Sequence, residues 1–143
     1  MGIQTVAVHS TADADAMHVR LADESICIGP ATSKDSYLNM AAIVSAATIT
    51  NVDAIHPGIG FLSENAEFAE MIEDHGIAFV GPSPEHIRSM GEKVEAKRLA
   101  VDLGLPVVPG SAGSINSDEE AQKVADSIGY PVLIKAAAGG GGK

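Results

Sequence analysis

The sequence is poor in cysteine, in aromatic residues and in positive charge. A single cysteine, Cys27, excludes an internal disulfide framework and any cysteine-based zinc site. Cys27 lies between Ile26 and Ile28, an apolar setting that predicts a buried, inert thiol rather than a reactive one. Because there is no tryptophan and only 3% of the residues are aromatic, the core must consist mainly of Ala, Val, Ile and Leu. Small aliphatic residues of this kind suit helices packed on a mostly parallel sheet.

Charge and the length of the apolar runs exclude further classes of protein. The 143 residues include 9 basic and 19 acidic ones, for a formal net charge of −10. Such a field repels nucleic acid and anionic membranes, so we expect neither as a partner. No apolar run approaches the roughly 18 to 20 residues of a membrane span, and no signal-peptide pattern is visible. We expect a soluble intracellular protein, cytoplasmic or, in a eukaryote, in the mitochondrial matrix.

Short apolar runs alternate with longer amphipathic segments along the chain. We expect strands at 3–9, 25–28, 53–55, 77–80, 107–108 and 132–135. Helices are expected at about 13–22, from Ser36 to about Ile49, from an N-cap at Ser63 to Asp74, and at about 84–90, 93–103 and 118–128. This alternation predicts an α/β fold with parallel strands, in which ligands bind at the carboxyl ends of the strands.

The C-terminal segment is the clearest candidate phosphate site. Lys135 ends the apolar run 132–134, and a lysine that completes a buried strand needs an anionic partner. The backbone N–H groups of consecutive glycines are unshielded and can fold around an anion. The four glycines are Gly139, Gly140, Gly141 and Gly142. Their spacing is not that of a Walker A loop, and a flexible linker is the simpler alternative for the glycines alone.

A second candidate segment follows the strand expected at 53–55. It begins at His56 and brings two glycines, a carboxylate and an amide to a strand end: Gly58, Gly60, Glu64 and Asn65. An equally simple interpretation is a tight turn before a helix, with Glu64 complementing the helix dipole. His56 alone is more typical of a loop-packing residue than of a base, and no second His or Cys lies at metal-ligand spacing.

Lys93 is the third candidate, at the start of a predicted helix. Its charge opposes the helix dipole there, which indicates that the side chain points at a bound anion. Taken alone, a solvated surface lysine is the simpler explanation of this position.

Together these segments resemble the biotin carboxylase family, within the larger ATP-grasp group. The most specific string is His-Pro-Gly-x-Gly-Phe-Leu-Ser-Glu-Asn at 56–65. Other strings that carry the resemblance lie at 5–10, 22–24, 36–39, 79–82, 90–93, 109–111 and 129–143. The resemblance implies a Rossmann-like N-terminal domain at 1–91 without its first strand and helix, a helical connection at 92–104, and the beginning of an ATP-grasp lid at 105–143.

The resemblance also implies a reaction. ATP would phosphorylate bicarbonate to carboxyphosphate, and the released carbon dioxide would be transferred to N1 of biotin on a carrier protein. Lys93 and Lys135 would contact the nucleotide phosphates, and the four glycines would close over them. The family usually has Tyr where this chain has Ile59, so a ring or hydroxyl contact would be lost. The border of the biotin and bicarbonate pocket would be formed by His56, Gly58, Gly60, Glu64 and Asn65.

Other parts of the site are expected beyond Lys143. The resemblance places the magnesium-binding glutamates and the catalytic arginine there, so the chain alone would be inactive and poorly stable. It implies a biotin carboxyl carrier protein or domain, a carboxyltransferase and a second copy of the subunit as partners. The final acyl acceptor stays open.

Two alternatives to this function remain. One is another ATP-grasp ligase, such as a carbamoyl-phosphate-synthesising enzyme, against which the His-Pro-Gly string argues. The other is a non-catalytic nucleotide-binding module, which the isoleucine at position 59 favours.

Overall fold

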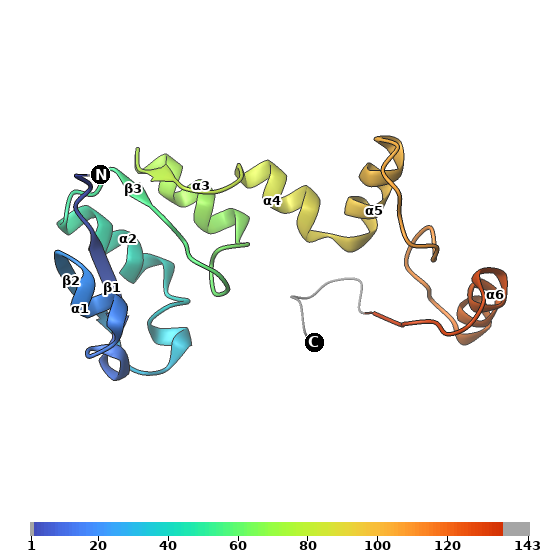
Figure 1. Cartoon of the computed structure of the whole chain (residues 1–143), viewed down its shortest axis with the longest axis horizontal. Coiled ribbons are helices and arrows are strands. Elements are labelled where there is room, and N and C mark those ends of the chain that lie inside the picture. The colour runs from blue at the N-terminus through green and yellow to red at the C-terminus, as the bar shows by residue number, and fades with distance from the viewer. Residues whose placement is uncertain (1, 136–143) are drawn as a thin grey trace. The chain divides into compact units, whose positions relative to one another are not determined.

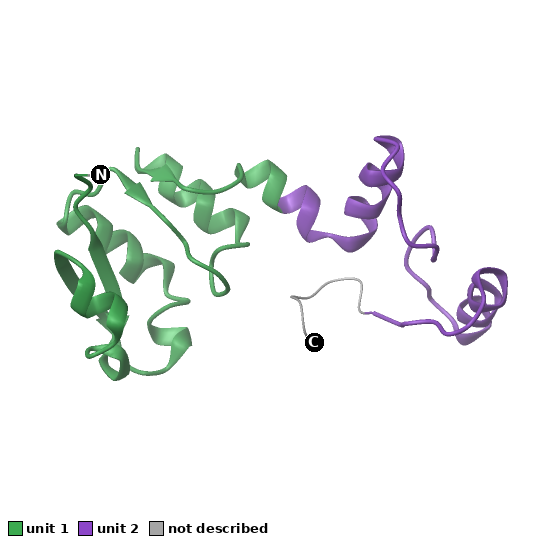
Figure 2. Cartoon of the chain, viewed as in Figure 1, with its two compact units in different colours: residues 1–87 green, residues 88–143 purple. Residues whose placement is uncertain are grey.

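The computed structural model describes residues 2–135 and divides the chain into two compact units (Figures 1 and 2). The first unit comprises residues 1–87 and the second comprises residues 88–143. None of the helices within 2–135 combines the length and the apolar character that a membrane crossing needs.

The strands of the first unit form two parallel pairs. Strand β1 (Val6–Ser10) pairs with β2 (Glu24–Gly29), and β3 (Ala54–Ile55) pairs with β4 (Ala78–Phe79). The prediction of parallel strands is therefore confirmed. At the start of the first pair, the Asp23 carboxylate accepts hydrogen bonds from the backbone N–H and the hydroxyl of Thr5, both at 2.8 Å. The two contacts join the residues that immediately precede β1 and β2.

Helices connect these strands and supply most of the core. They are α1 (Met17–Leu21), α2 (Met40–Ile49) and α3 (Ala66–Asp74), with short 3₁₀ turns at Thr11–Asp13 and Ser33–Asp35, and α4 (Pro84–Gly91) follows across the unit boundary. Phe68 of α3 packs edge-on against Phe79 of β4, with ring centroids 6.1 Å apart. The predicted core positions Phe68 and Ile72 are buried, and Met71 is partly buried against them. The remaining core is Val44, Ala47, Leu62, Ala69, Ile77 and Ile87.

Two helices begin later than the sequence predicts. Helix α2 starts at Met40 because the Asn39 side chain accepts from the backbone N–H of Ala42 at 3.1 Å. Ser36, the predicted start, is instead buried, and its hydroxyl donates to the carbonyl of Thr32. Helix α3 likewise begins after Asn65. The prediction of Ser63 as the N-cap is therefore wrong. Serine and asparagine are equally good N-caps, so the residue type alone does not show which of the two begins the helix.

The helix predicted at 13–22 is shortened, and the prediction for Cys27 is wrong. The hydroxyl of Ser10 donates to the Asp13 carboxylate at 2.7 Å, and such local bonds compete with helix formation. Cys27 is exposed while its neighbour Ile28 is buried. Successive side chains of a strand point to opposite faces, and the face of β2 that carries Cys27 is uncovered.

The second unit is helical wherever it has regular structure among its described residues. Helices α5 (Lys93–Asp102) and α6 (Asp118–Ile128) confirm the predictions, and Ser117 caps α6 by accepting from the N–H of Glu120. The strands predicted at 107–108 and 132–135 are not formed in the described part of this unit. Leu133 and Ile134 are 78% and 83% exposed. An apolar run becomes a strand only when another strand supplies its hydrogen bonds, and none pairs with these residues.

Gly29 ends β2 at a place where no side chain fits. Its φ is +149°, and a Cβ atom there would collide with the backbone oxygen of Asp35. Gly76 also has a positive φ, of +72°, but open space around it. We predict that Gly29→Ala lowers the free energy of unfolding by about 3 kcal/mol or more, because strain and overlap add.

The matched control for this prediction is Gly76→Ala, which carries the conformational strain alone and should cost about 1 kcal/mol. Urea unfolding of both variants measures the difference. Equal losses of stability would show that the overlap at Gly29 is relieved at no cost.

Candidate functional site

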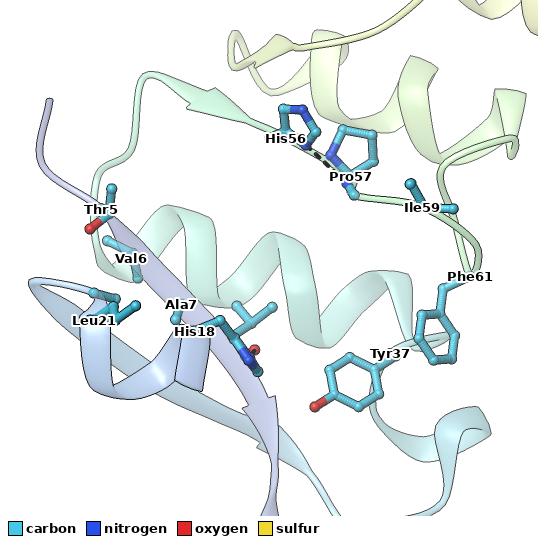
Figure 3. Close-up of a pocket in the computed structure, with 13 residues that line it drawn as sticks. Thr5, Val6, Ala7, His18, Leu21, Tyr37, His56, Pro57, Ile59 and Phe61 are labelled. Carbon is cyan, nitrogen blue, oxygen red and sulfur yellow. Dashed lines mark hydrogen bonds between the residues drawn. The ribbon is translucent and has the colours of Figure 1, made fainter. Parts of the chain in front are cut away.

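A pocket of about 730 Å³ lies in the first unit, beside β1 and the loop that follows β3 (Figure 3). The loop leaves the carboxyl end of its strand, where the parallel fold predicts a ligand site. Most of the side chains around the pocket are apolar, and its polar groups come from Thr5, His18, Tyr37 and His56. The other lining residues are Val6, Ala7, Val8, Leu21, Ala22, Pro57, Gly58, Ile59 and Phe61.

The loop after β3 holds an unusual backbone. Gly58, Gly60 and Phe61 have φ values of +68°, +79° and +46°, all in the left-handed region. Glycine enters this region freely, but a phenylalanine there is strained. Leu62 anchors the loop by burying its side chain in the core, and the N–H of Ser63 donates to the carbonyl of Gly60 at 2.9 Å. The loop is thus fixed at its C-terminal side and turned outward at Ile59, which is 99% exposed.

His56 stabilises the turn into this loop. Its ring nitrogen Nδ1 accepts a hydrogen bond from the backbone N–H of Gly58 at 3.1 Å (Figure 3). An accepting Nδ1 carries no proton, so in this arrangement the proton of the neutral ring is on Nε2. The interpretation of His56 as a loop-packing residue accounts for this contact, while its exposed ring still faces the pocket.

The predicted border residues divide into two groups. His56 and Gly58 line the pocket, whereas Gly60, Glu64 and Asn65 do not. Asn65 has a structural role, because its side-chain oxygen accepts from the N–H of Phe68 at 2.8 Å and caps α3. Gly60 permits the turn that leads to Phe61.

Sequence reasoning missed a polar cluster at the end of β1. The Tyr37 hydroxyl donates to the Asp13 carboxylate at 2.5 Å and accepts from the backbone N–H of Ser10 at 2.9 Å. The Ser10 hydroxyl donates to the same carboxylate oxygen at 2.7 Å. The Tyr37 ring also stacks on Phe61, with centroids 5.0 Å apart and planes 28° apart. A serine three residues before an aspartate is a weak local signal, and nothing in the sequence pairs either with Tyr37.

These contacts set the electrostatics of the cluster. Hydrogen bonds from Tyr37 and then Ser10 hold the pKa of the Asp13 carboxyl below its usual range, with His18 and His9 adding smaller favourable charges. Burial, followed by the hydrogen bond to Asp13, raises the pKa of Tyr37. The carboxylate is the form that accepts both bonds, so the cluster is built around an ionised Asp13.

The predicted phosphate contacts belong to the second unit. Lys93 is exposed at the first position of α5, whose N-cap residue Glu92 makes no capping hydrogen bond through its side chain. Helix N-terminal N–H groups without a side-chain cap suit an anion. Lys135 is exposed at the end of the described chain. The predicted loop Gly139–Gly142 lies outside the described residues.

Magnesium ligands are not found in the part of the chain that the structure describes. There, no three His, Cys, Asp or Glu side chains gather into a group that could hold a metal ion. The described residues thus fit phosphate groups through their cations and backbone N–H groups, and they do not fit a magnesium ion.

Family models match both units. Residues 1–87 match the model described as biotin carboxylase, N-terminal domain, and residues 92–143 match the ATP-binding domain of the carbamoyl-phosphate synthase L chain. The fold and the pocket define a parallel α/β protein with a pocket beside the loop at a strand end. The chain belongs to the biotin carboxylase family.

Individual relatives agree with this assignment. The chain is 59% identical to biotin carboxylase 1 of Bacillus subtilis over 143 residues. The match covers all of this chain and 32% of the Bacillus subtilis protein. It is 56% identical to a chloroplastic biotin carboxylase of Arabidopsis thaliana, covering 27% of that protein. A mitochondrial location in eukaryotes is therefore not borne out by these relatives, which are bacterial and chloroplastic.

Solved structures of biotin carboxylases have the same fold. The Campylobacter jejuni enzyme, in a complex with an ATP ligand, superposes with a TM-score of 0.92 at 51% identity over 99% of this chain and 32% of its own. The biotin carboxylase domain dimer of Hydrogenobacter thermophilus 2-oxoglutarate carboxylase, with MgADP, ADP and bicarbonate, gives 0.90 at 48% identity over 99% and 31%. The chain thus spans about a third of the length of the proteins it matches.

The lowered pKa of Asp13 leads to a prediction about acid stability. A carboxyl whose pKa is lower in the folded state stabilises that state above its unfolded pKa, and the contribution is lost as the pH falls through the folded value. We therefore predict that stability falls below about pH 4, where carboxylates become protonated, and that Asp13→Asn reduces this dependence.

Urea midpoints between pH 2.5 and 7 test this prediction, with Asp15→Asn, at an exposed neighbouring position, as the matched control. Parallel pH profiles for the Asp13→Asn variant and the unsubstituted protein would contradict it.

Proposed function

We propose that this chain is the N-terminal third of a biotin carboxylase that carboxylates carrier-bound biotin at the expense of ATP. The γ-phosphoryl group of ATP passes to a bicarbonate oxygen, giving ADP and carboxyphosphate. Carboxyphosphate then releases phosphate and carbon dioxide, and the carbon dioxide forms a bond to N1 of biotin as that nitrogen loses its proton. The single observation that carries the proposal is the similarity to biotin carboxylases over the whole chain, 59% to the Bacillus subtilis protein.

The proposal gives the two units different tasks. Residues 1–91 form the Rossmann-like domain, 92–104 the helical connection and 105–143 the start of the ATP-grasp lid. Lys93 and Lys135 bind nucleotide phosphates by charge, and the N–H groups at the start of α5 add hydrogen-bond donors. The loop Gly139–Gly142 closes over the same phosphates. Bound magnesium neutralises phosphate charge during the transfer, and its ligands come from outside the described residues.

The pocket of the first unit supplies the biotin and bicarbonate side of the site. Its largely apolar wall suits the fused ring system of biotin, and His56 and the backbone of Gly58 offer polar groups at the edge. Gly60, Glu64 and Asn65 do not line the pocket itself, and in this proposal they border the site from the rest of the loop and the part of the chain that follows it. Position 59, fully exposed at the rim, is open to whatever the pocket receives.

The partners follow from this function. A biotin carboxyl carrier protein or domain presents the biotin, and a separate carboxyltransferase accepts the carboxyl group. The Hydrogenobacter thermophilus structure is a domain dimer, which supports a homodimer for the complete protein. We propose a cytoplasmic location for the enzyme, in keeping with its similarity to biotin carboxylases of bacteria.

Another ATP-grasp ligase is the weaker candidate. The relation to carbamoyl-phosphate synthase is confined to residues 92–143, the ATP-binding part, whereas the first unit matches biotin carboxylases. Bicarbonate-dependent ATP cleavage that needs biotin, assayed with the complete protein, separates the two functions. ATP cleavage that is indifferent to biotin would overturn the proposal.

Loss of either lysine charge should weaken ATP binding. A charge-assisted hydrogen bond contributes about 1.5–3 kcal/mol, so Lys93→Gln and Lys135→Gln in the complete protein should each raise the KM for ATP about ten- to a hundredfold. Lys34→Gln in the 3₁₀ turn Ser33–Asp35 of the first unit is the matched control and should leave the KM unchanged. Steady-state kinetics at saturating bicarbonate measure these values. An unaltered KM for ATP in both lysine variants would remove them from the site.

Ile59→Tyr should restore an aromatic contact at the rim of the pocket. An aromatic contact contributes roughly 0.5–1.5 kcal/mol, so the variant should lower the KM for biotin about two- to tenfold. Ile59→Phe, which supplies the ring without the hydroxyl, distinguishes the two groups. If both variants keep the original KM for biotin, position 59 does not contact it.

A further inference from the structure

The pocket loop is held by a chain of contacts that begins at a buried residue of β1. Ser10 is completely buried at the end of β1, and both its N–H and its hydroxyl are used, the first toward the Tyr37 hydroxyl and the second toward the Asp13 carboxylate. Since the Tyr37 hydroxyl also donates to Asp13, it is fixed by two hydrogen bonds, one accepted and one donated. Two such bonds define both the position of the oxygen and the direction of the ring.

The Tyr37 ring, held in this position, contacts the pocket loop at Phe61. It stacks on Phe61 at a centroid distance of 5.0 Å with the ring planes 28° apart, and Figure 3 shows the two rings next to each other. Phe61 is 58% exposed, so burial in the core does not hold it. Its φ of +46° is unfavourable for a residue with a side chain. A strained, exposed residue keeps its conformation only when its surroundings impose it, and stacking on Tyr37 is the ring contact present.

We propose that Tyr37 is a positioning residue, which sets the conformation of the loop at 56–61 through Phe61 and thereby the shape of the pocket. The consequence for activity rests on the proposed function, in which this loop borders the biotin and bicarbonate site. Tyr37 acts through its neighbours: the hydroxyl connects it to β1 and the ring connects it to the loop. ATP binding is assigned to lysines of the second unit, whereas the contacts of Tyr37 described above are all made within the first unit.

Hydrogen exchange of the complete protein tests the structural part. Tyr37→Phe keeps the ring and removes the hydroxyl, and Phe61→Leu removes the stack and keeps the polar cluster. Both should speed amide exchange at 56–61 by about tenfold or more, while exchange across α3 stays the same. The double variant should exceed neither single variant, because both act through one connection. Tyr130→Phe, which removes the hydroxyl of the other tyrosine, is the matched control.

Kinetics test the functional part. Tyr37→Phe should raise the KM for biotin about tenfold and leave the KM for ATP unchanged, whereas a residue that only supports folding would lower the amount of active enzyme without separating the two constants. Tyr130→Phe, the matched control of the exchange experiment, should keep the original KM for biotin.

The possible failures are distinguishable. Unchanged exchange at 56–61 in both Tyr37→Phe and Phe61→Leu overturns the positioning role, whatever the enzyme does. If Tyr37→Phe does not fold, Phe61→Leu, a substitution at an exposed ring, decides the exchange question alone. A complete protein without bicarbonate-dependent ATP cleavage would refute the proposed function and leave the exchange result standing. Equal increases in the KM for biotin and for ATP would count against a local role of Tyr37.

Discussion

Parallel strand pairing is the constraint on which the first unit depends. Two parallel strands cannot be joined by a tight turn, so each pair needs a crossover through a helix. Helix α1 lies in the chain between β1 and β2, and α3 lies between β3 and β4. Because of the crossovers, the two strands of each pair run in the same direction, so their carboxyl ends lie at the same edge of the pair. The turn with Ser10 and Asp13 after β1 and the loop with His56 after β3 both arise there.

The two candidate ligand regions solve different electrostatic problems. The chain as a whole carries a formal charge of −10, which opposes the approach of any anion. In the second unit, Lys93 and the N–H groups at the start of α5 provide local positive potential despite this field. In the first unit, the Asp13 carboxylate is a structural acceptor for Tyr37 and Ser10.

The sequence predicted most of the helices and the parallel strands, because periodicity and turn residues are local signals. It failed where the outcome depends on a distant partner. Residues 132–135 have the composition of a strand, yet no strand pairs with them in the described chain, and their side chains are exposed. Cys27 has apolar neighbours on both sides but lies on the uncovered face of β2. For the site, His56 and Gly58 could be found from their string, whereas the contact of Tyr37 with Phe61 joins residues that no local pattern connects.

In the pocket loop, two residues with positive φ flank one without it, and this pattern limits which positions can be substituted. Gly58 and Gly60 are restricted by conformation, since both have positive φ although space surrounds them. Ile59, between them, is fully exposed and is free of that restriction. A random change at 58 or 60 is therefore penalised in folding, while a change at 59 alters only what the rim presents to the solvent side of the pocket. Within residues 58–60, position 59 is therefore the one at which a substitution changes the rim of the pocket without this conformational cost.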